Sequence, residues 1–148
     1  MRGLALDLPL PGSGHTWERW ESLVEISARD LSLGRLAEGH TDAVAILSEL
    51  DGPAPEGLWG VWAAERAEQR VGQTLDEDGG LLTGRKASCS GAAYLDNALF
   101  TAHSDGARRM VASSTRVVRQ VPDSWQAVGM RDSGSIAVDV CDIPAVAV

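Results

Sequence analysis

Two hydroxyls and a thiol stand side by side in the segment Leu82–Ala92, which reads L-T-G-R-K-A-S-C-S-G-A. Ser88 and Ser90 carry hydroxyl donors, and small neighbours such as Cys89 let a ligand lie close to the backbone. Such a segment suits hydrogen bonding to the edge of a ligand that carries acceptor atoms. The alternative is structural: Ser90 ends a strand before a glycine, and without further support this interpretation is the stronger one.

A second polar segment, Trp125–Pro144, contains Gly129-Met130-Arg131, and Ser133 and Ser135 follow closely. An arginine in this position can pair with a carboxylate or a phosphate through two parallel hydrogen bonds. We expect Arg131 to form a structural or inter-domain ion pair, with cofactor contact as the lesser alternative.

Other chemistries lack their sequence motifs. His40 has no cysteine, histidine or carboxylate partner at metal-ligand spacing, so we expect a core or surface histidine and no metal site. The chain contains no G-x-S-x-G elbow, no P-loop, no G-x-G-x-x-G and no C-x-x-C.

The composition narrows the class of partner. With 21 acidic and 13 basic residues the net charge is −8, which opposes binding to a phosphate backbone. No stretch approaches the roughly 20 apolar residues of a membrane span. Two cysteines are too few for a disulfide framework, and the first 14 residues do not resemble a secretory signal. We therefore expect a cytoplasmic protein with reduced thiols and neither nucleic-acid nor membrane partners.

Two amphipathic helices should precede these segments. After a leader over residues 1–15, apolar residues recur every three or four positions from an N-cap at Thr16 to Leu31, and again from Leu33 to Leu50. The prolines and glycines of Asp51–Gly57 then end the helical pattern. We expect a helical hairpin over residues 16–56.

Short β-type runs bounded by turns fill residues 57–148, which predicts an antiparallel β-barrel or sandwich and an α+β fold class for the whole chain. Alternation in the last run gives Cys141 an outward or interface position. A hairpin turn is expected at Asp76–Gly80. The expected strands are 58–64, 70–75, 81–86, 98–102, 110–113, 116–121, 125–128 and 135–140.

Taken together, the two polar segments resemble the middle β-domain of the acyl-CoA dehydrogenases. Leu82–Ala92 corresponds to the family's G-x-K-x-W-I-T strand, and Trp125–Pro144 to its G-x-R-x-S/T strand pair. Asp30–Ala43 looks like the helix that precedes this domain, and Leu58–Glu65 like the strand that ends in T-E-P. The order and spacing of these motifs, over most of residues 16–148, carry the resemblance.

The resemblance implies an FAD cofactor. A flavin presents N5 and carbonyl oxygens at one edge, and Ser90, at the position of the family's threonine, would donate there while Cys89 and Gly91 allow a close backbone approach. Ser88 stands where the family often has a tryptophan beside the flavin. Trp59 and Trp62 are sterically able to replace it, although such tryptophans are more often core residues.

The T-E-P position reads Ala64-Glu65-Arg66, which keeps the glutamate but lacks the hydroxyl and the proline. The Gly-Ser-Asp loop that helps the family hold flavin and acyl thioester does not follow. By resemblance, Ala64 and Glu65 join Ser88, Cys89 and Ser90 as cofactor-side residues. We expect Glu65 to be an exposed carboxylate at a strand end rather than a catalytic base.

The family desaturates an acyl thioester at its α and β carbons, and its catalytic base belongs to a C-terminal helical bundle that this chain does not contain. We therefore assign no catalytic residue and expect this chain alone to be inactive. The function implied is that of a flavin-binding portion of an acyl-CoA dehydrogenase-like oxidoreductase, which forms a homo-oligomer or takes a separate C-terminal helical partner. The alternative is a non-catalytic interaction or assembly module derived from the family.

Overall fold

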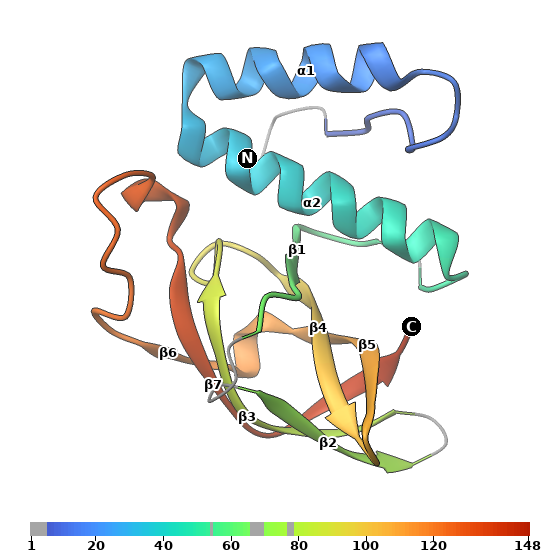
Figure 1. Cartoon of the computed structure of the whole chain (residues 1–148), viewed down its shortest axis with the longest axis vertical. Helices are drawn as coiled ribbons and strands as arrows, with labels where there is room; N and C mark the ends of the chain where they lie inside the picture. Colours follow the sequence, from blue (N-terminus) through green and yellow to red (C-terminus); the bar gives the residue numbers. More distant parts are fainter. Residues whose placement is uncertain (1–5, 54, 66–69, 77–78) are drawn as a thin grey trace.

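A computed structural model describes residues 6–53, 55–65, 70–76 and 79–148 (Figure 1). Two helices, α1 (Thr16–Arg29) and α2 (Leu31–Glu49), run antiparallel and lie against one end of a β-barrel. The chain thus has the α+β fold class expected from its sequence. In the described part of the chain, no helix is long and apolar enough to cross a membrane.

The helix boundaries depend on capping residues. The N-cap of α1 is His15 rather than Thr16, and its ring Nδ1 lies 2.9 Å from Glu18 Oε1. Asp30 ends α1 and caps α2, because its side chain accepts a hydrogen bond of 2.8 Å from the Leu33 amide. Leu31 therefore begins α2, whereas its apolar spacing had predicted that it would end α1.

The barrel closes through a ring of paired strands, β4–β2–β3–β7–β5 and back to β4. β1 lies along the same edge of β4 as β2, and β6 pairs with β7. The β1–β4 and β2–β4 pairings are parallel, so the sheet is mixed where an antiparallel one was expected. The strands are β1 (Trp59–Trp62), β2 (Val71–Asp76), β3 (Gly79–Cys89), β4 (Asn97–Ser104), β5 (Ala107–Ser114), β6 (Arg119–Val121) and β7 (Ile136–Ala147).

Two predicted strands are wrong in whole or in part. The run 125–128 is irregular: Asp123 turns the chain at φ 54°, and the Ser124 hydroxyl accepts the Ala137 amide hydrogen bond at 2.7 Å. At 116–121 a 3₁₀ turn, Thr115–Val117, delays β6 until Arg119. The predicted hairpin between β2 and β3 is confirmed by their antiparallel pairing, but residues 77–78 at its tip lie outside the described residues.

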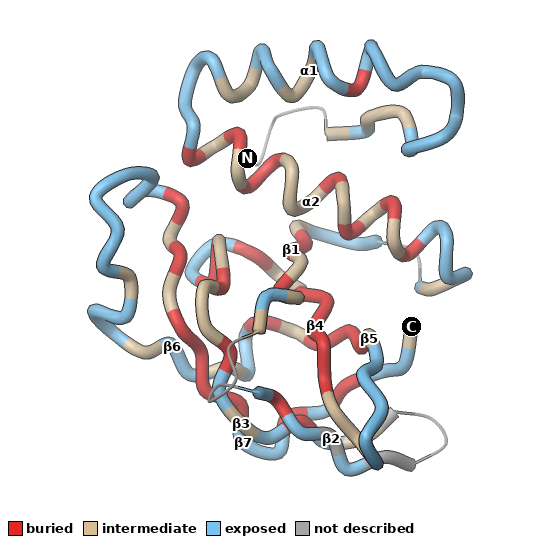
Figure 2. Tube along the Cα trace, in the orientation of Figure 1, coloured by how far each residue is buried: buried red, intermediate tan, exposed pale blue. Residues whose placement is uncertain are grey.

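Apolar packing joins the helices to the barrel. Trp62 and Phe100 meet edge to face inside the barrel, with ring centroids 5.1 Å apart. A second buried cluster links α2 to β1, β4 and β5 through Ala43, Leu47, Trp59, Leu99 and Ala112. The buried face of α2 points toward the barrel (Figure 2). Trp59 and Trp62 are thus core residues.

Candidate functional site

A β-bulge near the end of β3 shapes the segment Ser88–Ser90. Lys86 pairs with Val138 and Cys89 with Ile136, so β3 uses one residue more than β7 over this stretch. Lys86 and Cys89 are both fully buried, although regular alternation would place them on opposite faces. Ser88 takes up the extra residue with φ 57°, and it is left partly exposed.

Ser90, also partly exposed, is held by hydrogen bonds from two other segments. Trp62 Nε1 donates to the Ser90 carbonyl at 3.0 Å, and the Ser135 hydroxyl donates to Ser90 Oγ at 3.0 Å. Ser135 Oγ lies 2.8 Å from Ser133 Oγ, which donates to the Met130 carbonyl at 2.7 Å. Ser133 and Ser135 are buried, whereas Ser90 is partly exposed and lines a crevice of about 10 Å³ between α2 and β1.

The motif G-x-R-x-S/T contained Ser133 and Ser135, but no sequence signal paired them with Ser90. The link depends on the strand register, which brings Cys89 opposite Ile136. The backbone fixes it further, since the Gly91 amide donates to the Ser133 carbonyl at 2.8 Å. Gly91 itself is required for internal packing: φ is 73°, and a Cβ would lie 2.8 Å from Leu36 Cδ2.

Next to Ser88 lies a pocket of about 350 Å³ with mixed polar and apolar walls. One wall carries an ion cluster, in which Asp139 accepts from Arg85 at 2.5 Å and from Arg119 at 2.7 Å. The hydrogen bond from Arg85 is the largest effect on Asp139 and lowers its pKa, with Arg119 adding to it. The pocket is lined by Arg85, Ala87, Ser88, Val121, Ser124, Trp125, Gln126, Ala127 and Ala137.

Cys89 points into the barrel core. Its thiol is fully buried, and this burial raises its pKa to about 12. Any contact between Cys89 and a ligand would therefore come from its backbone. Cys141, in contrast, is exposed as its place in the alternating pattern predicted.

Glu65 belongs to a charged cluster rather than to an exposed strand end. Its carboxylate lies 2.9 Å from His103 Nε2 and 3.5 Å from Lys86 Nζ, and its side chain is only 16 % exposed. Burial alone would raise the Glu65 pKa, but hydrogen bonds from Thr101 and His103 and the charge of Lys86 outweigh it and lower the pKa to about 2. The expectation of an exposed Glu65 was wrong because β4 supplies partners that are distant in sequence. Ala64, beside it, is exposed.

Sequence reasoning passed over Lys86, the only lysine of the chain. Its ammonium is completely buried and donates to the carbonyl of Thr101 at 3.1 Å and to the Thr101 hydroxyl. Burial lowers the pKa of Lys86, and the Glu65 carboxylate opposes that effect. The available signal was that this single lysine stands at the lysine position of the G-x-K-x-W-I-T motif.

His40 and Arg131 do not add to the site. His40 is partly buried: its Nδ1 accepts from the Trp59 amide at 3.2 Å, and burial lowers its pKa. Arg131 is exposed and pairs with no carboxylate among the described residues. Within the same residues no cluster of histidine, cysteine and acidic side chains could hold a metal ion.

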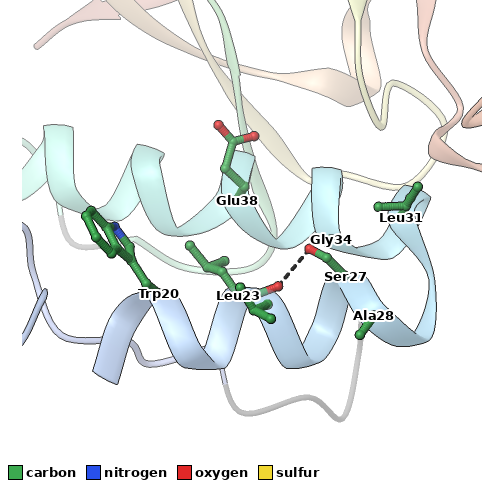
Figure 3. Close-up of a pocket in the computed structure, with 8 residues that line it drawn as sticks. Trp20, Leu23, Ser27, Ala28, Leu31, Gly34 and Glu38 are labelled. Carbon is green, nitrogen blue, oxygen red and sulfur yellow. Dashed lines mark hydrogen bonds between the residues drawn. The ribbon is translucent and has the colours of Figure 1, made fainter. Parts of the chain in front are cut away.

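The two helices enclose an apolar groove of about 460 Å³ away from the barrel (Figure 3). Trp20, at 57 % exposure, stands at one end and Leu31 at the other. The helices approach closely at Gly34, where a Cβ would lie 2.2 Å from Ser27 Oγ. The groove is lined by Trp20, Leu23, Val24, Ser27, Ala28, Leu31, Gly34 and Glu38.

Comparison with solved structures finds this fold in several proteins, two of which were solved with FMN. KijD3, solved with FMN and dTDP-3-amino-2,3,6-trideoxy-4-keto-3-methyl-D-glucose, matches 84 % of this chain with a TM-score of 0.67 and 18 % identity. FkbI, for biosynthesis of the methoxymalonyl extender unit of the Fk520 polyketide, matches 89 % with a TM-score of 0.71 and 20 % identity. TdsC from Paenibacillus sp. A11-2, solved with FMN and indole, matches 87 % with a TM-score of 0.59 and 21 % identity.

The chain spans 37 %, 44 % and 38 % of the lengths of KijD3, FkbI and TdsC, respectively. No protein-family model matches the sequence, and no curated protein sequence matches it. At these identities the likeness establishes a shared fold.

Proposed function

We propose that this chain is the flavin-binding portion of an oxidoreductase, with Ser88–Ser90 facing the flavin. The observation that carries the proposal is the partly exposed Ser90, which directly follows β3 and is held there by hydrogen bonds from Trp62 to its carbonyl and from Ser135 to its hydroxyl. Two of the structures that share the fold, KijD3 and TdsC, contain FMN. We therefore propose a flavin cofactor with an isoalloxazine ring, either FMN or FAD. An acyl thioester substrate is expected only from the sequence resemblance.

The chemistry of the segment fits this group. The N5 and carbonyl edge of a flavin needs hydrogen-bond donors, and Ser90 offers one in a partly exposed position. The pocket beside Ser88, at about 350 Å³, lies within the range of ligand pockets, and the Arg85 guanidinium on its wall suits a flavin carbonyl or phosphate oxygen. A bound flavin would supply hydride transfer, whereas the described residues bind and orient it.

A helical partner completes the proposal. Trp17, Trp20 and Val24 of α1 are 73 %, 57 % and 66 % exposed, an apolar stripe at helical spacing beside the groove. A third helix laid between α1 and α2 would bury this stripe. KijD3, FkbI and TdsC are longer than this chain, which favours a separate covering segment. The alternative cover is a second copy of the chain, and sedimentation would reveal such a dimer.

Titration of FMN and of FAD with the chain tests the flavin proposal, with flavin fluorescence as the readout. We expect a saturable change in fluorescence, and Ser90→Ala should weaken binding about two- to tenfold through loss of one hydrogen bond. Ser113→Ala is the control for loss of a serine hydroxyl, because Ser113 is buried in β5 and donates to the Pro144 carbonyl away from the proposed site. Fluorescence that stays constant for both flavins would refute the proposal.

The apolar groove favours a second candidate function, a non-catalytic interaction module. In that case the chain would bind no flavin yet form a stoichiometric complex through α1 and α2. Trp20→Glu should abolish the complex without unfolding the chain, since more than half of the Trp20 side chain is exposed. Flavin binding by the wild-type chain would rule against this candidate.

A further inference from the structure

The polar side chains that line the groove between α1 and α2 already have partners within the chain. The Ser27 hydroxyl donates to the Leu23 carbonyl at 2.7 Å, and Glu38 pairs with Arg35. A ligand in this groove therefore gains mainly from apolar contact. The stretch of chain from Trp20 to Leu31 (Figure 3) corresponds to about 16 Å of helix, or roughly three turns.

The exposed stripe of α1 has the spacing of a helix–helix contact. Trp17, Trp20, Val24 and Ser27 recur at intervals of three, four and three residues, the repeat that lets one helix pack lengthwise on another. Trp17 and Trp20 are 73 % and 57 % exposed. Tryptophan is enriched among the residues that contribute most to binding, and the face of its ring attracts cations.

Two carboxylates border this stripe on the side opposite Leu23. Glu21 and Glu25 directly follow Trp20 and Val24 on α1, and both are exposed. Neither has an ion-pair partner among the described residues. Like charges four residues apart on a helix repel each other, so a cation placed beside both would relieve that repulsion.

We infer that the groove binds a basic amphipathic helix of about three turns, whose apolar residues pack between α1 and α2 and whose cations face Glu21 and Glu25. This inference rests on the helical partner of the proposed function and gives that partner its chemistry. A second copy of the chain suits the groove less well, because each copy carries a net charge of −8.

The test measures binding of the whole chain to a fluorescein-labelled peptide of about 14 residues, two heptads of leucine and lysine with one apolar helical face. Its counterpart carries glutamate in place of each lysine. We expect a saturable rise in anisotropy with the lysine peptide that weakens with salt, and binding of the glutamate peptide that is weaker by about tenfold or more. Equal affinity for the two peptides, or binding of neither, would overturn the inference.

A pair of double variants tests the charge contact. Glu21→Gln combined with Glu25→Gln should weaken binding of the lysine peptide about three- to tenfold at low salt. Glu49→Gln combined with Glu56→Gln removes two exposed charges that do not line the groove, so the affinity should stay within about twofold of wild type. Equal losses in the two double variants would show unspecific attraction to an acidic chain and overturn the inference.

A second pair tests the apolar contact. Val24→Ala should weaken binding about two- to tenfold through lost apolar burial, and alanine favours the helix, so the chain stays folded. Val128→Ala, at a valine that is 85 % exposed outside both helices, should leave binding unchanged. A wild-type dimer that Val24→Ala dissociates in sedimentation would overturn the inference in favour of a second copy. The peptide experiment contains no flavin, so unchanged flavin fluorescence would overturn only the flavin proposal.

Discussion

Replacement of Glu65 by glutamine should destabilise the barrel by an amount that depends on pH. At pH 6 the variant resembles the protonated carboxyl, so it lacks the carboxylate that faces Lys86 and His103. A fall in the Glu65 pKa from 4.5 to about 2 corresponds to roughly 3 kcal/mol of stability, at about 1.4 kcal/mol per pH unit. This agrees with the roughly 3 to 5 kcal/mol expected when a buried ion pair loses one partner.

The sign follows from the lowered pKa. The folded protein binds the Glu65 proton more weakly than the unfolded chain, so the stabilisation is present above pH 4.5 and is lost as the pH falls toward 2. At pH 3 the wild-type advantage over Glu65→Gln should shrink to roughly 1.4 kcal/mol. Urea unfolding followed by tryptophan fluorescence at pH 6 and pH 3 measures both values.

Two controls sharpen this experiment. Glu25→Gln removes an exposed charge on α1 and should change stability by less than about 0.5 kcal/mol at either pH. Lys86→Met in the Glu65→Gln background removes the stranded buried cation and should restore part of the loss. A Glu65→Gln effect of the same size at both pH values would refute the assignment of Glu65 to an ionised cluster.

Two further predictions concern packing and thiol access. Gly34→Ala should destabilise the chain by about 1 to 3 kcal/mol, because the added Cβ clashes with Ser27. Gly39→Ala should be neutral or stabilising by up to about 1 kcal/mol, because the nearest atom lies 3.7 Å from the added Cβ. Equal effects of the two variants in urea unfolding would contradict the close helix contact. Ellman's reagent should detect one fast thiol in the native chain, from the exposed Cys141, and a second only in urea, because Cys89 is buried with a pKa of about 12. Two fast native thiols would show that the barrel opens at Cys89.

The sequence predicted the helices and most strands because their signals are local. Apolar spacing and the proline-rich linker each act within a few residues, so the two helices and the change to β structure were correctly foreseen. The errors came where a side chain replaces a backbone partner. Ser124 takes up the Ala137 amide and prevents a strand at 125–128, and the Asp30 cap divides an apolar run that spacing alone would continue.

The candidate site was less predictable because its contacts are long-range. Ser90 meets Ser135 only through the register of β3 and β7, and Glu65 meets His103 through the pairing of elements nearly 40 residues apart in sequence. The bulge at Ser88 also lies beyond simple alternation, which would have placed Lys86 and Cys89 on opposite faces. Residue types do not specify which residues of two strands pair, so the burial of the single lysine could be recognised only in the folded structure.

The central claim, that a flavin binds against Ser88–Ser90, is tested most directly by ¹H–¹⁵N NMR of the chain titrated with FMN. The method detects weak binding and reports which amides respond. We predict progressive shifts confined to residues 88–91, 124–126 and 133–135, which surround Ser90 and the pocket beside Ser88. Unchanged spectra, or shifts confined to the groove between α1 and α2, would contradict the account.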